Sequence, residues 1–174
     1  MKMENNKMRE IKIEKVVLSV AGTAEKLEKG ARLLKTISGM EPKKLASKKR
    51  IPSFGVRPGL ETGAKVTLRK NKISPILIRL LQAVNNEIKR SQIVDNHFSF
   101  GIHEYIEIPG LEYQRDIGIL GLNVTVDFTR AGERVARKKI KRGKIPARQR
   151  VTKEEIIDYM TKHFEIKLKE RKEK

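Results

Sequence analysis

The side chains with the clearest chemical potential in this sequence are cationic, and they are concentrated in two segments. Residues 41–72 contain ten Lys or Arg and two acidic residues, and residues 130–150 contain ten Lys or Arg and one acidic residue. Together they carry +17 of the chain's net charge of +19. A single basic run is often only a solvated face. Two runs that hold nearly all the excess charge favour a polyanionic partner, most simply nucleic acid and secondly an anionic membrane.

Patterns for catalysis or metal binding are weak. The chain has no Cys, which excludes disulfides, thiolate zinc sites and Cys nucleophiles. His97, His103 and His163 are scattered, and Glu107 stands where a zinc-protease motif starting at His103 needs its second His. There is no glycine-rich phosphate loop and no paired carboxylates for metal-dependent phosphoryl transfer. We therefore expect no enzymatic activity, no metal and no cofactor.

The length of 174 residues fits one domain with a substantial core. The longest uncharged run, residues 117–126, is shorter than the ~20 residues that span a membrane, and the N-terminus lacks the apolar core of a signal peptide. We expect a cytoplasmic protein with no membrane partner. It would consist of a flexible N-terminus (1–10), one α+β RNA-binding domain (11–166) and a charged tail (167–174).

Apolar periodicity predicts strands alternating with helices. The expected strands are 11–20, with a bulge near Glu14, then 64–69, 97–108 and 120–129. The expected helices are 24–38, capped by Thr23, a second that starts at Ser74-Pro75 and has an apolar stripe to Ile88, and a third after Thr152, with a capping box to Glu155. This pattern indicates an α+β two-layer sandwich. Helices would cover one face of a mostly antiparallel sheet, and the other face would stay polar and open.

The two basic segments fall between these elements. Residues 43–63 form a long connection rich in Pro and Gly, a basic loop, and residues 130–150 read as an extended basic arm. Long connections of this kind are usually functional, and a basic arm suits a phosphate backbone. Phe54, in the middle of the loop, either anchors the loop to the body or is presented at its tip to pack on RNA. Because Phe98, Phe100 and Phe128 lie on apolar faces, we expect recognition of folded RNA through phosphates and shape rather than base stacking.

Six ordered blocks of the sequence resemble the universal large-subunit ribosomal protein family number five, which binds 5S rRNA. The blocks are residues 48–59, 63–69, 96–102, 108–113, 117–122 and 144–155. Their order and spacing hold over residues 8–166, and the last block looks like the archaeal and eukaryotic branch. The resemblance implies the α+β sandwich described above, placed in the central protuberance of the large subunit. Its implied partners are 5S rRNA, large-subunit rRNA, neighbouring ribosomal proteins and the P-site tRNA.

The resemblance also implies site residues. The open sheet face and adjoining basic segments would bind rRNA, and the loop near residues 50–63 would reach the elbow of the P-site tRNA. The expected rRNA-binding residues are Lys15, Ser19, Lys43, Lys44, Lys48, Lys65, Thr67, Arg69, Arg137, Lys138, Lys139, Lys141, Arg142, Lys144 and Arg148. The expected tRNA-contacting residues are Arg50, Ser53, Phe54, Gly55, Val56 and Arg57. Lys15 and Thr67 match the family's sheet-side contacts, whereas Ser19 replaces its usual Asn and Met40 its usual Gln.

The alternative is a non-ribosomal RNA chaperone or a nucleic-acid-processing enzyme. A chaperone would bind many RNAs with similar affinity. An enzyme would need a cluster of acidic or His residues, which the sequence does not display.

Overall fold

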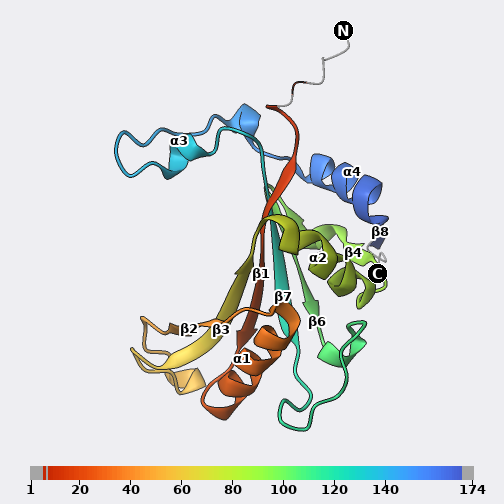
Figure 1. Cartoon of the computed structure of the whole chain (residues 1–174). Helices are drawn as coiled ribbons and strands as arrows, with labels where there is room; N and C mark the ends of the chain where they lie inside the picture. Colours follow the sequence, from red (N-terminus) through yellow and green to blue (C-terminus); the bar gives the residue numbers. More distant parts are fainter. Residues whose placement is uncertain (1–5, 7, 170–174) are drawn as a thin grey trace, which may run out of the picture.

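A long first strand, β1, lies at the centre of the sheet (Figure 1). The computed structural model describes residue 6 and residues 8–169 of the chain. β1 (Lys12–Ala21) pairs antiparallel with β3 (Glu61–Leu68) on one side and with β7 (Leu122–Thr129) on the other. The sheet is completed by β2 (Lys43–Ala46), β6 (His97–Ile102) and β5 (Ile93–Val94), in the order β2-β3-β1-β7-β6-β5. Every pairing in this six-stranded sheet is antiparallel.

Three helices cover one face of the sheet (Figure 1). They are α1 (Glu25–Ser38), α2 (Ile73–Gln82) and α4 (Lys153–Phe164). Their buried residues, such as Leu34, Leu77 and Ile156, join one apolar cluster with the inward side chains of the strands. The expected α+β two-layer sandwich is therefore confirmed.

Alternation along the strands separates the two faces of the sheet. In β1, Val16 and Leu18 are fully buried under the helices, while Val17 and Ser19, on the opposite face, stay partly exposed. Phe98 packs in the core between Phe100 and Phe128, with ring centroids 5.9 and 5.8 Å apart. The prediction that these rings belong to the core is confirmed.

The helix caps were predicted with mixed success. The capping box of α4 is confirmed, since the Thr152 amide donates to the Glu155 carboxylate at 3.0 Å and the Glu155 amide donates to the Thr152 hydroxyl at 3.5 Å. The prediction that Thr23 caps α1 was wrong, because Ala24 is the N-cap residue and no side chain caps the helix. α2 begins at Ile73, so Ser74 lies inside the helix rather than capping it. Proline at the next position is tolerated because first-turn amides have no partner within the helix.

Two predicted strands and one predicted helix are shorter than expected. β6 ends at Ile102 and is followed by a 3-10 turn, η4 (Tyr105–Glu107), while β7 begins only at Leu122. α2 stops before Asn85 and Asn86, whose φ values of 54° and 56° are left-handed, a conformation that Asn adopts more readily than most residues. Ile88 therefore lies on a strand instead of the helix.

That strand, β4 (Glu87–Lys89), pairs in parallel with β8 (Lys167–Lys169). The pairing is supported by an ion pair of 2.9 Å between Lys169 Nζ and Glu87 Oε2. β8 falls within the segment expected to be a charged tail, so the first three residues of that segment are part of the fold. The remainder, 170–174, and most of the N-terminal segment, 1–5 and 7, lie outside the described residues.

Candidate nucleic-acid interface

The face of the sheet that the helices leave uncovered carries a polar surface built by cross-strand register. Residues directly opposite one another on paired strands share a face. One such row crosses five strands and consists of Lys43, Lys65, Ser19, Asn123 and Gly101. The next row consists of Thr67, Val17, Thr125 and Ser99, and a third joins Lys15, Asp127 and His97. The structure thus brings together five expected rRNA-binding residues, Lys15, Ser19, Lys43, Lys65 and Thr67.

The same rows contain residues that we had not assigned to the site. Asn123, Thr125 and Ser99 complete the open face with amide and hydroxyl groups that can donate to or accept from RNA. The alternation in residues 122–129 was the signal that could have identified the first two, because it already placed them on the polar side of their strand. Met40, by contrast, packs against the core.

The basic loop is more ordered than its composition suggested. Its first residues form β2, which pairs with β3, so Lys43 and Lys44 belong to the sheet. The prediction of a connection without regular structure was therefore wrong at this end. The hairpin continues to Ser47, whose amide donates to the Leu60 carbonyl at 2.8 Å. Main-chain hydrogen bonds thus order the base of a strongly basic projection, the finger formed by residues 47–60.

The tip of this finger closes on itself. Ile51 and Val56 exchange two backbone hydrogen bonds of 2.9 and 3.1 Å around the turn Pro52–Phe54 (η1), and Gly55 takes the left-handed φ of 64° that the turn requires. Phe54 is 76% exposed, so it is presented at the tip and does not anchor the loop to the body. Val56 is only 7% exposed. The other expected tip residues, Arg50, Ser53, Gly55 and Arg57, are exposed.

The basic arm is folded at its base rather than extended. It contains a short helix, α3 (Arg134–Arg137), and a 3-10 turn, η5 (Ala147–Gln149). The chain returns on itself where the Gly143 amide donates to the Val135 carbonyl at 3.1 Å, and a Cβ on Gly143 would lie 2.6 Å from Val135 Cγ1. The arm that we expected to be extended is therefore partly folded. The close backbone approach at Gly143 shapes the arm into a projecting loop.

Ion pairs attach this arm to the body. Arg130 contacts Glu155 of α4, and Arg137 contacts both Glu133 of the arm and Glu14 of β1. Arg69 Nη1 reaches Glu14 Oε1 from the other side at 3.5 Å. Glu14 lies at the expected β-bulge, since the pairing of β1 with β7 shifts between Ile13 and Lys15.

The two carboxylates of this cluster have opposite pKa shifts. Partial burial tends to raise the pKa of Glu14, but hydrogen bonds with Arg137 and Glu133 and the charges of Arg137 and Lys15 lower it overall. Partial burial and the neighbouring Glu14 raise the pKa of Glu133. Glu14 is therefore the member of the pair that stays ionised to lower pH.

The expected basic residues differ in whether an acid already neutralises them. Lys15 pairs with Asp127 at 2.9 Å and Lys44 with Glu61 at 3.3 Å, while Arg69 and Arg137 share Glu14. The Arg142 side chain donates to the Ala136 carbonyl. Within the described part of the chain, those without an acidic partner are Lys43, Lys48, Lys65, Lys138, Lys139, Lys141, Arg142, Lys144 and Arg148.

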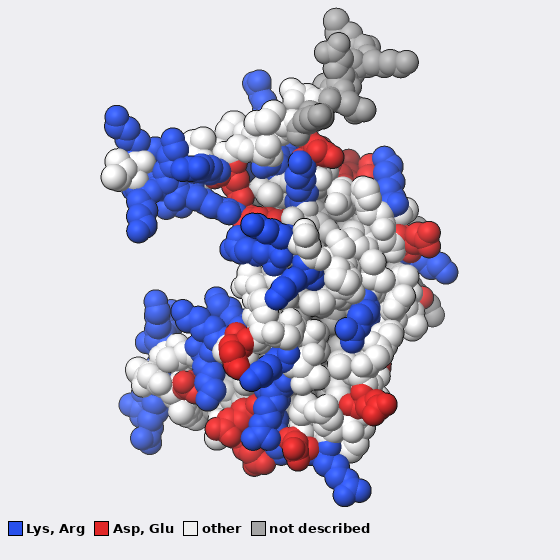
Figure 2. Space-filling view, viewed as in Figure 1, with Lys and Arg blue, Asp and Glu red and all other residues white. Residues whose placement is uncertain are grey.

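Loop and arm project from the same side of the molecule, and Figure 2 shows Lys and Arg gathered on both projections and on the surface between them. A groove of about 940 Å³ lies between the arm and the open face of the sheet. Its lining combines Lys15, His97 and Asp127 of the sheet with Arg137, Lys144 and Arg150 of the arm. The arrangement is a concave basic surface that matches a polyanion larger than the groove itself.

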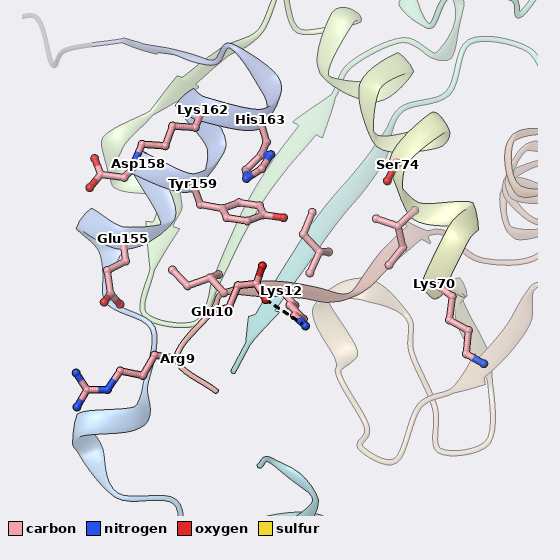
Figure 3. A pocket seen from close by; sticks show the side chains of 13 residues that line it. Arg9, Glu10, Lys12, Lys70, Ser74, Glu155, Asp158, Tyr159, Lys162 and His163 are labelled. Atoms are coloured by element: carbon pink, nitrogen blue, oxygen red, sulfur yellow. Dashed lines mark ion pairs between the residues drawn. The ribbon is translucent and has the colours of Figure 1, made fainter. Parts of the chain in front are cut away.

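A second groove, of about 770 Å³, lies on the helical side between α4, the start of β1 and the start of α2 (Figure 3). Its charges are mixed, because Lys12, Lys70 and Lys162 alternate with Glu10 and Asp158. Burial, and to a smaller extent the charge of Glu10, raises the pKa of Tyr159, so its hydroxyl stays neutral. This groove therefore lacks the clear excess of basic side chains that lines the groove between the arm and the sheet.

Across residue 6 and residues 8–169, no three His, Asp or Glu side chains gather as metal ligands. Over the same range, no helix is long and apolar enough to cross a membrane.

Comparison with known proteins identifies the family. The model of ribosomal protein L5 matches residues 6–57, and the model of the C-terminus of the same ribosomal family matches residues 61–159. The chain belongs to the ribosomal protein L5 family. The large ribosomal subunit protein uL5 of Nanoarchaeum equitans is 44% identical over 164 residues, which cover 92% of this chain and 97% of that relative. The uL5 of Pyrobaculum aerophilum is 42% identical over 163 residues, 92% of this chain and 91% of the relative.

Membership in the L5 family confirms the resemblance seen in the six sequence blocks, including its archaeal character. L5 proteins are structural components of the large ribosomal subunit and not enzymes. Ribosomal RNA is accordingly a partner of this protein.

Proposed function

We propose that this L5 protein binds 5S rRNA in the central protuberance of the large subunit of cytoplasmic ribosomes, beside other ribosomal proteins. The observation that carries the proposal is the polar open face of the sheet, on which Lys65 and Ser19 lie opposite each other, together with the two basic projections of the molecule (Figure 2). Folded RNA presents phosphates and 2′-hydroxyls over a broad surface, which suits such a face. Polar side chains on the sheet would fix the position of the RNA, while basic side chains of the loop and the arm neutralise its phosphates.

Titration of 5S rRNA over a range of salt concentrations tests this assignment. Each phosphate contact contributes a slope of about −0.7 to −0.9 in log K against log salt. Lys65→Ala should make the slope less steep by about one contact, whereas Lys26→Ala removes an exposed cation from α1 on the helical face and should leave it unchanged. Equal effects of the two substitutions, or equal affinity for unrelated RNAs of similar size, would support the non-specific chaperone instead.

We further propose that the finger formed by residues 47–60 contacts the P-site tRNA. Its tip presents Phe54 between the exposed Arg50 and Arg57, and hairpin hydrogen bonds order both its base and its tip. An exposed aromatic ring can stack on a base or pack on a ribose, which contributes about 1–3 kcal/mol per base by alanine substitution. A rigid finger with one aromatic residue and flanking cations suits a partner that arrives after the subunit has been assembled.

The hairpin geometry allows the finger to be removed cleanly. Because Ser47 already pairs with Leu60, residues 48–59 can be replaced by the two-residue turn Asn-Gly. We predict that 5S rRNA affinity stays nearly unchanged and that tRNA leaves the P site of assembled ribosomes at least about fivefold faster, as expected for a loss of ~1 kcal/mol. Phe54→Ala alone should reproduce much of this effect. Unchanged tRNA off-rates together with lost 5S binding would mean that the two RNA surfaces are assigned the wrong way round.

A further inference from the structure

An acidic residue occupies an unexpected place at the junction of the open sheet face and the arm. The Glu14 side chain is only 12% exposed, while Arg69 and Arg137, which contact it from two sides, are 56% and 48% exposed. A carboxylate within an RNA-binding surface ordinarily weakens binding, because it repels phosphates. Its burial between two exposed guanidinium groups points to a different role.

The bulge in β1 explains how Glu14 reaches this place. Val16 faces the core, so strict alternation would turn Glu14 toward the core as well. The register shift between Ile13 and Lys15 breaks the alternation and re-aims the side chain toward the base of the arm, while Lys15 stays on the open face opposite Asp127. The bulge thus supplies a carboxylate at a point where β1 contacts the arm.

The geometry leaves both guanidinium groups able to bind a further anion. Each Arg has five N–H donors in a planar fork. Arg137 uses Nη2 for Glu14 and Glu133, and Arg69 uses Nη1 for Glu14, so the remaining donors stay available on side chains that are about half exposed. Arg137 also lines the groove between the arm and the sheet. A fixed Arg loses less conformational freedom on binding a phosphate than a mobile one.

We propose that Glu14 is a positioning residue that joins the arm and the open sheet face into one continuous site for RNA backbone phosphates, by holding Arg69 and Arg137 in place. The inference rests on the rRNA binding proposed above. Glu133 and Thr129 complete the support, since the Thr129 hydroxyl donates to Glu133 Oε2 at 3.0 Å and Glu133 contacts the same guanidinium of Arg137.

Glu14→Gln tests the proposal, with full-length 5S rRNA transcribed in vitro as the probe. The substitution adds one net positive charge, so simple electrostatics predicts tighter binding and an unchanged or steeper salt slope. The positioning role predicts the reverse: weaker binding, and a slope that is less steep by about one to two phosphate contacts of ~0.7–0.9 each. Tighter binding, or an unchanged slope, would overturn the proposal.

Two controls separate positioning from loss of fold and from general charge effects. The slope does not depend on the fraction of active protein, so partial unfolding alone would leave it unchanged. Glu61→Gln removes an exposed acid that pairs with Lys44 at 3.3 Å, and it should not weaken binding. In an Arg69→Gln/Arg137→Gln background, adding Glu14→Gln should have no further effect on the slope, and a remaining loss would refute action through these two residues.

The same titrations distinguish the two proposals. Wild-type protein that does not bind 5S rRNA would refute the proposed function. Wild-type binding with a fully competent Glu14→Gln variant would refute only the positioning role.

Discussion

Lys43 and Lys65 lie directly opposite each other on β2 and β3, and both are exposed. Within the described residues neither has an acidic partner. Like charges directly opposite each other on paired strands destabilise the sheet, and cross-strand pairs change stability by roughly 0.2–1 kcal/mol. We predict that Lys65→Thr, which introduces a good strand former, raises the free energy of unfolding by about 0.2–1 kcal/mol and at the same time weakens rRNA binding.

The magnitude can be checked in three ways. Urea unfolding should show a higher midpoint with an unchanged m-value, and a gain of 1 kcal/mol would raise Tm by about 2–4 °C in a protein of this size. Because both ammonium groups are exposed, the gain should shrink as salt shortens the Debye length below ~8 Å. The salt slope of 5S rRNA binding should become less steep by about 0.7–0.9.

The partner lysine provides the matched control. Lys43→Thr should give a similar gain in stability, and the double variant should gain less than the sum of the two, because one substitution already removes the repulsion. A Lys65→Thr protein that is less stable than wild type, or that binds rRNA as well as wild type, would refute the reasoning.

Three further predictions concern the scaffold. Gly30→Ala should destabilise the protein in urea, because its Cβ would lie 2.6 Å from Val20 Cγ1 and overpacking of ~1–3 kcal/mol exceeds the ~1 kcal/mol gained in helix propensity; equal or greater stability would contradict it. Thr152→Ala should lower the free energy of unfolding by about 1 kcal/mol through loss of the α4 cap, and an unchanged urea midpoint would argue against that cap. The pKa of Glu14 lies below its ordinary value of 4.5, so the stability of wild type over Glu14→Gln should be full above that pH and fall as pH drops through the lowered pKa; a difference that grows on acidification would contradict this sign.

Much of the fold could be predicted from local sequence pattern. The alternation in residues 122–129 and the apolar stripe of α1 correctly indicated which faces turn inward, because each side chain's burial follows from a period of 2.0 or 3.6 residues. The ends of elements were harder. Nothing local to Ile88 distinguishes one more helical turn from a short strand, since the strand forms only by pairing with Leu168, far along the chain.

In the candidate site, too, local sequence predicted the location of the residues but not their contacts with distant parts of the chain. Charge density located the loop and the arm, and the family resemblance located the sheet residues Lys15, Ser19 and Thr67. The sequence could not reveal that Arg137 is already paired, because Glu14 lies more than 120 positions away and reaches it only through the bulge. Nor could it separate Phe54 from Val56 at the finger tip, where the turn exposes one side chain and buries the other.

The central position of β1 has a consequence for synthesis on the ribosome. β1 can pair with β3 once residue 68 has left the exit tunnel, but its other edge must wait for β7, which ends at residue 129. At ~5–20 residues per second, the roughly 60 intervening residues keep that edge open for about 3–12 s. An unpaired edge in the middle of a sheet is a template for pairing with other chains. The nascent protein should therefore need a chaperone, or early contact with its RNA, during this interval.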